Sequence, residues 1–130
     1  MSSAIRAGLV YFALVFAIGF GLGAIRVGIV IPRVGEFVAV CLELPLMLGS
    51  AWWICRRITH ALAVPAGIAA RASMGATAFA ALMLAELALA VLVFGRTPAQ
   101  HLARYASAAA LLGLAGQILF AAFPILQRRR

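Results

Sequence analysis

The sequence predicts an all-α protein, a four-helix transmembrane bundle that forms one integral membrane domain over residues 1–130, and three observations carry this prediction. Of the 130 residues 66% are hydrophobic and only 11% are charged, whereas a soluble domain carries roughly 25% charged residues. The apolar residues fall into four continuous runs, each near the length of about 20 residues that a helix needs to cross a bilayer. These runs do not alternate between apolar and polar residues, as barrel strands would. The composition therefore excludes a soluble enzyme and a disulfide-stapled secreted domain.

The first two runs predict a tight antiparallel pair of helices. The first covers residues 7–31 and stops at Pro32 and Arg33, and the second covers residues 35–55. So short a connection leaves room only for a turn, and proline cannot continue a helix interior because it has no N–H to donate. Hydrophobicity in the first run continues past the roughly 15 residues of a signal-peptide core, so we expect a retained helix.

The third and fourth runs predict two further helices, over residues 73–94 and 98–126. Thr97 and Gln100 have the spacing of a capping box, in which each side chain bonds the other residue's backbone N–H. Pro98 lies between them at the first helical position, where its fixed φ suits a helix start. We therefore expect the fourth helix to begin at Pro98 and to project beyond the bilayer.

The arginines predict the orientation. If the N-terminus is cytoplasmic, seven of the eleven arginines lie on that side and three on the other, with Arg26 inside the first span. The positive-inside rule then places both termini in the cytoplasm (N-in/C-in), as for a multi-pass protein of the bacterial inner membrane. Anchoring in an anionic leaflet explains the net charge of +8, so we expect no nucleic-acid partner. The expected partners are the lipid bilayer and, through small residues such as Gly19 and Gly23, a homo-oligomer or larger membrane complex.

Ionisable residues within the spans are the candidate site: Arg26, Glu43 and Glu86, with Arg33 and Glu36 near the interface. At about 1.5 Å of rise per residue, the first three lie at nearly the same depth in the outer half of the membrane. A charge at such depth costs about 2.5–3.5 kcal/mol or more, so we expect Arg26 to bridge Glu43 and Glu86. One arginine for two carboxylates leaves one negative charge over. That carboxylate must be protonated, exposed to water, or paired with Arg33 or a ligand.

Two interpretations of this cluster stay open. In the first it is structural and ties three helices together; in the second, Glu43 or Glu86 binds a proton, a cation or a cationic solute. Pro45 removes the helical hydrogen bond to the Cys41 carbonyl and should kink the second helix, which suits a ligand site or simple packing. Gln117, mid-membrane on the fourth helix, is expected to hydrogen-bond across the bundle.

The sequence contains no phosphate-cradling loop, no His/Cys metal set and no nucleophile–base pair. We therefore expect no catalytic residues, no metal site and no cofactor. The first hypothesis is a non-enzymatic accessory or packing subunit, or a small-solute binding module. The alternatives are a proton-coupled transporter or ion channel that uses Glu43 or Glu86, and a membrane enzyme acting on a lipophilic substrate.

Three segments, residues 23–26, 32–36 and 43–48, resemble a family of small, uncharacterised bacterial inner-membrane proteins, which implies four helices but no particular activity. Residues 43–46 are also similar to the second helix of membrane-associated eicosanoid and glutathione metabolism proteins, where a Glu precedes a Pro. The Arg-and-Asn pattern ahead of that Glu is missing here, since the chain has no Asn. Small multidrug-resistance transporters are similar in length, but their membrane Glu lies in the first helix, where this chain has Arg26.

Overall fold

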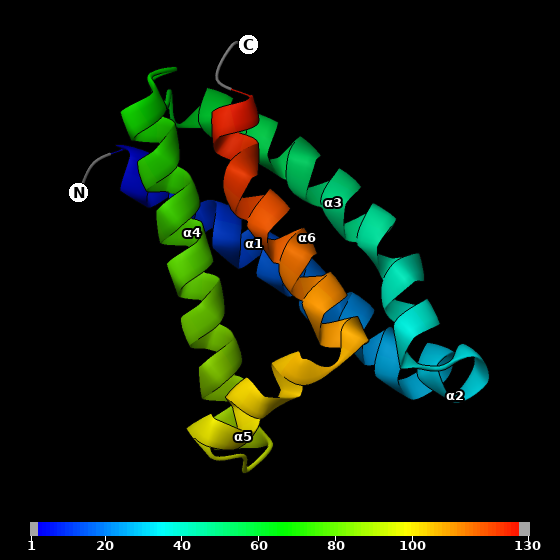
Figure 1. Ribbon diagram of the computed structural model, residues 1–130. Coiled ribbons are helices and arrows are strands. Elements are labelled where there is room, and N and C mark those ends of the chain that lie inside the picture. The colour runs from blue at the N-terminus through cyan, green and yellow to red at the C-terminus, as the bar shows by residue number, and fades with distance from the viewer. Residues whose placement is uncertain (1–2, 128–130) are drawn as a thin grey trace.

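The structure, a computed structural model, describes residues 3–127, and this part of the chain contains helices but no strand (Figure 1). Four segments are long and apolar enough to cross a membrane: Ser3–Val34, Glu36–Ala61, Ile68–Val93 and Ala108–Leu126. In chain order the elements are α1 (Ser3–Ile25), η1 (Arg26–Val30), α2 (Ile31–Val34), α3 (Glu36–Ala61), α4 (Ile68–Ala88), η2 (Leu89–Val93), α5 (Pro98–Ala103), η3 (Arg104–Ala106) and α6 (Ala108–Leu126). The predicted all-α bundle is confirmed.

The first span runs three residues further than expected. It continues through a π-helical turn, η1, in which the Ile31 N–H donates to the Arg26 carbonyl, and then through the short helix α2. Pro32, the second residue of α2, has no N–H to donate to the preceding turn, so the regular hydrogen bonding is interrupted where η1 lies. The chain instead reverses at Gly35, whose φ of +87° suits a residue without a Cβ. The antiparallel pair is therefore joined by one glycine.

The helix expected over residues 98–126 is in fact two helices, which corrects the predicted boundary. The capping box of Thr97 and Gln100 is present and starts α5, but α5 ends at Ala103. Ser107 then adopts an extended conformation, and its hydroxyl accepts from the Ala110 N–H to cap α6. A second strong N-cap thus breaks the helix where the sequence pattern suggested continuity. The third helix also differs, since α4 begins at Ile68 rather than at residue 73.

The four spans form a ring in which each contacts two neighbours. Helix α1 packs against α3 and α4, and α6 packs against the same two, so that α3 and α4 lie diagonally across the bundle. Figure 1 shows α3 and α4 on opposite sides, with α1 and α6 crossing between them. The start of α1 and the end of α6 share one end of the bundle. We call this the inner end, after the orientation expected from the arginines, and the opposite end the outer end.

The tight core lies in the inner half of the bundle and contains polar groups that meet backbone carbonyls. Tyr11 is fully buried, its ring stacks on Phe120 at 4.4 Å between centroids, and its hydroxyl donates to the Phe120 carbonyl at 2.7 Å. That carbonyl needs a donor because Pro124, four residues later, has no N–H. Arg71, 4% exposed, donates to the carbonyls of Pro65 and Pro124 at 3.1 and 3.0 Å. Side chains thus satisfy carbonyls left open at helix ends and at proline.

We expect Tyr11→Phe to lower the free energy of unfolding by about 1 kcal/mol, because the Phe120 carbonyl would lose its donor while the ring contact stays. The measurement is an SDS titration of the detergent-solubilised protein, followed by tryptophan fluorescence. Tyr105→Phe is the matched control, since Tyr105 lies outside the spans and its hydroxyl makes no hydrogen bond within the described residues. Equal stability of the two variants would contradict this role of the Tyr11 hydroxyl.

Close helix contact occurs at glycines other than those singled out from the sequence. A Cβ on Gly75 would lie 2.1 Å from the Ala121 carbonyl oxygen, and one on Gly8 would lie 2.6 Å from the Met74 carbonyl oxygen. These distances place the backbones of α4 and α6, and of α1 and α4, in direct contact. Gly19 and Gly23 meet only side chains, so the small-residue faces that hold this chain together are at the inner half.

Candidate functional site

Arg26 and Glu43 form an ion pair between the first two spans. Arg26 is the first residue of η1, and Glu43 follows seven residues after the start of α3. The guanidinium Nη1 donates to the carboxylate Oε2. The Glu43 side chain is 12% exposed and the Arg26 side chain 31%. Because hydrocarbon solvates neither charge, each residue stabilises the other at this depth.

Glu86 on α4 is held by an amide rather than by a cation. Gln117 on α6 donates from Nε2 to both carboxylate oxygens, at 2.9 Å and 2.8 Å. The expected hydrogen bond of Gln117 across the bundle is therefore confirmed. Gln117 Oε1 is buried and has no hydrogen-bond partner among the described residues. Glu86 thus accepts both of its hydrogen bonds from a neutral amide, and no cation among the described residues pairs with it.

The predicted bridge from Arg26 to both carboxylates is not what the structure shows. Within residues 3–127 the arginine is paired with Glu43 alone, and Glu86 is bonded to Gln117. Depth alone cannot distinguish these arrangements, because α3 and α4 are both neighbours of α1 and of α6. Arg26 lies in η1, which packs against α3, whereas Glu86 lies on α4 beside Gln117 of α6.

The other residues expected at the site lie closer to its rim. Arg33 in α2 and Glu36 at the start of α3 are both exposed, and neither forms an ion pair with the buried charges in the described chain. Helix α3 runs through Pro45 as one element, so the Cys41 carbonyl lacks its usual helical donor. A group of three His, Cys, Asp or Glu that could hold a metal does not occur among the described residues.

Tyr105 lies in η3, in the segment that connects the third and fourth spans. Burial, and secondly the negative charge of Glu86, raise the pKa of the Tyr105 phenol above its ordinary value. The phenol therefore stays neutral at physiological pH and can exchange hydrogen bonds without adding charge. The His101 ring of α5 packs edge-on against it at 5.7 Å between centroids. The segment between the last two spans thus places polar aromatic groups at the outer side of Glu86.

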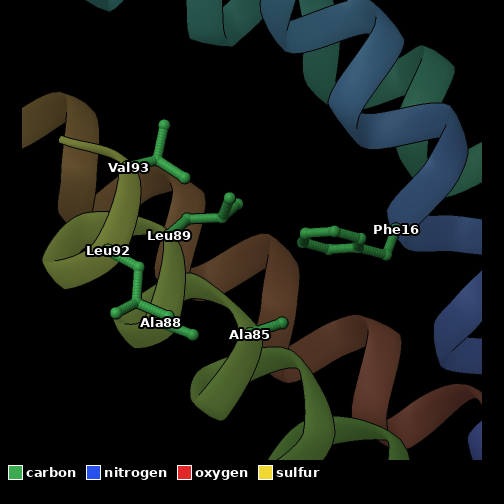
Figure 2. Close-up of a pocket in the computed structure, with 6 residues that line it drawn as sticks. All are labelled: Phe16, Ala85, Ala88, Leu89, Leu92 and Val93. Atoms are coloured by element: carbon green, nitrogen blue, oxygen red, sulfur yellow. The ribbon is translucent and has the colours of Figure 1, made fainter.

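A shallow, open apolar groove of about 280 Å³ lies beside α4, next to the turn that carries Glu86. Figure 2 shows the Phe16 ring projecting from α1 toward Ala85 and Leu89 on the opposite wall. The remaining lining side chains are Ala88, Leu92 and Val93. The core cluster is confined to the inner half, so α1 and α4 are less tightly packed here than near Tyr11.

No protein-family model, curated protein or solved structure matches this chain. Function must therefore be inferred from the polar pairs themselves. An ion pair such as Arg26–Glu43 is internally neutral and can simply join α1 to α3. Glu86 differs, since its partner among the described residues is a neutral amide, which supplies no counter-charge.

The sequence interpretation missed the polar groups of the inner half, above all Arg71 and Gln127. Arg71 is one of the seven arginines that the expected orientation places on the cytoplasmic side, yet it is buried against two carbonyls. Gln127, 2% exposed, donates from Nε2 to the Trp52 carbonyl at 2.9 Å. Pro124 was the available signal, because a proline inside an apolar helix leaves a carbonyl that needs a donor from elsewhere.

Proposed function

We propose that this protein is a non-enzymatic, small-solute binding module of the bacterial inner membrane, and that Glu86 with Gln117 binds a proton or a protonated amine. The observation that carries the proposal is the pairing of Glu86 with a neutral amide alone. The unpartnered Gln117 Oε1 adds a further acceptor beside the carboxylate. A group that donates hydrogen bonds and brings positive charge satisfies both residues at once.

Support for the membrane assignment comes from the four apolar spans and from the arginine distribution. Support for a ligand-binding role, rather than for a purely structural one, comes from the contrast between the two carboxylates. Glu43 already has its counter-charge in Arg26, whereas Glu86 has only the neutral amide of Gln117. A bound proton or ammonium group would supply the positive charge that Glu86 lacks among its described partners.

The test is labelling with dicyclohexylcarbodiimide, an apolar reagent that adds to protonated carboxyl groups, on the protein in liposomes. We expect Glu86 to be modified about tenfold faster than Glu43, whose charge is held by Arg26, since tenfold corresponds to only 1.4 kcal/mol. Mass spectrometry reads both sites in the same molecule, so no variant is needed for the comparison. Dodecylammonium should protect Glu86, because it competes with the proton for the carboxylate. Labelling of Glu43 at an equal rate would refute the proposal, and fast labelling of Glu86 without protection by the amine would leave the proton as its ligand.

Proton-coupled transport is the second candidate, and the position of Tyr105 favours it. A neutral phenol near Glu86 offers a hydrogen-bonding step between that carboxyl and the outer surface. In liposomes with an imposed pH gradient, amine uptake should then depend on the gradient and be lost in Glu86→Gln. Glu36→Gln is the control, because Glu36 is exposed at the start of α3. Amine binding without gradient-driven uptake would leave the binding function and exclude transport.

A further inference from the structure

A small polar hollow lies at the inner end of the bundle, where α3 and α6 terminate. It is lined by Arg56, Thr59, His60 and Gln127 and has a volume of about 30 Å³. A water-sized group needs about 10–15 Å³ of such space, so the hollow can admit one small polar group. Arg56 and His60 are exposed and form its rim, whereas Thr59 and Gln127 are buried and form its floor.

The floor of the hollow offers hydrogen-bond acceptors that have no donor among the described residues. The Gln127 amide donates from Nε2 to the Trp52 carbonyl, and its Oε1 is buried without a partner among the described residues. The Thr59 hydroxyl donates to the Arg56 carbonyl at 3.0 Å, which leaves lone pairs on the oxygen. Both α3 and α6 end here, and helix C-termini carry partial negative charge. The floor therefore suits an ammonium group or another strong donor.

The rim has the opposite preference. The Arg56 guanidinium is always charged, has five N–H donors and is well suited to the oxygens of a phosphate. Glu36 and Arg56 lie 20 residues apart on α3, which at about 1.5 Å per residue corresponds to the 30 Å thickness of the hydrocarbon core. Arg56 thus lies at the level of lipid headgroups. Its neighbour Arg57 stacks on Trp53 at 5.2 Å, as residues of an interfacial belt do.

We propose that this hollow binds the phosphoethanolamine headgroup of a membrane phospholipid. The ammonium enters the hollow and donates to Gln127 Oε1 and Thr59 Oγ1, and the phosphate stays at the rim with Arg56 and His60. A choline headgroup does not fit this description, because its trimethylammonium has no N–H and is larger than a water-sized space. A glycerol headgroup supplies the phosphate but only hydroxyl donors.

The experiment is native mass spectrometry of the detergent-solubilised protein with dioleoyl phosphatidylethanolamine, phosphatidylglycerol or phosphatidylcholine. We expect phosphatidylethanolamine to bind about tenfold more tightly than phosphatidylcholine, the difference that one charge-assisted hydrogen bond produces. Arg56→Gln should weaken this binding about tenfold for the same reason. Arg57→Gln is the matched control, since it removes the same charge one residue away and should change affinity less than about twofold.

Gln127→Leu should abolish the preference for phosphatidylethanolamine over phosphatidylcholine while leaving binding through Arg56. Equal losses in Arg56→Gln and Arg57→Gln would overturn the proposal, because they would indicate unspecific attraction to charge. A preference for phosphatidylglycerol that persists in Gln127→Leu would overturn it as well. The comparison of the two arginine variants depends on exposed residues and does not disturb the buried floor. Soluble phosphoethanolamine in the same assay distinguishes headgroup recognition from the binding of a whole lipid.

Discussion

Gly75→Ala should destabilise this protein more than any other replacement of a glycine by alanine in its four spans. The added Cβ would lie 2.1 Å from the backbone oxygen of Ala121, closer than any van der Waals contact allows. Because the obstacle is a main-chain carbonyl, α4 and α6 must move apart, and the inner core must open with them. Overpacking of this kind costs about 1–3 kcal/mol and sometimes more.

Gly113→Ala is the control for this prediction. Gly113 also lies in α6, but a Cβ there would have no heavy atom within 4 Å. Its replacement should leave stability unchanged or raise it slightly, because alanine is the better helix former. SDS titration monitored by the fluorescence of Trp52 and Trp53 compares the two variants. If both unfold at the same SDS fraction, α4 and α6 do not touch at Gly75 in the membrane.

Arg26→Ala should cost about 3 kcal/mol of unfolding free energy, because Glu43 would keep its charge in the membrane without a partner. SDS titration of the detergent-solubilised protein, followed by the fluorescence of Trp52 and Trp53, measures the loss.

The double variant Arg26→Leu with Glu43→Leu tests the cause of that loss. Removal of both charges eliminates the uncompensated carboxylate, so stability should return to near the wild-type value. Arg33→Ala is the control for loss of one arginine, since Arg33 is exposed and makes no ion pair with the described carboxylates. A double variant as unstable as Arg26→Ala would mean that the side-chain packing of Arg26, rather than its charge, stabilises the fold.

Much of the architecture could be predicted because bilayer thickness constrains a sequence so strongly. An apolar run must be helical and about 20 residues long, since hydrocarbon cannot satisfy exposed backbone groups. The capping box at Thr97 was equally readable, because it depends on residues three apart in the chain. The break at Ser107 was harder to see, since serine is common within apolar helices and becomes a cap only when the backbone turns extended there.

The sequence by itself determined that the chain has four segments long and apolar enough to cross a membrane and that Arg26, Glu43 and Glu86 need partners within them. These properties follow from composition and from distance along each helix, which the sequence contains. Only the tertiary structure decided which partner each charge received. The contact of η1 with α3 assigned Arg26 to Glu43, and the contact of α4 with α6 assigned Gln117 to Glu86. Such packing depends on close backbone contacts such as Gly75 with Ala121, and apolar residues of similar hydropathy do not encode these contacts in any local pattern.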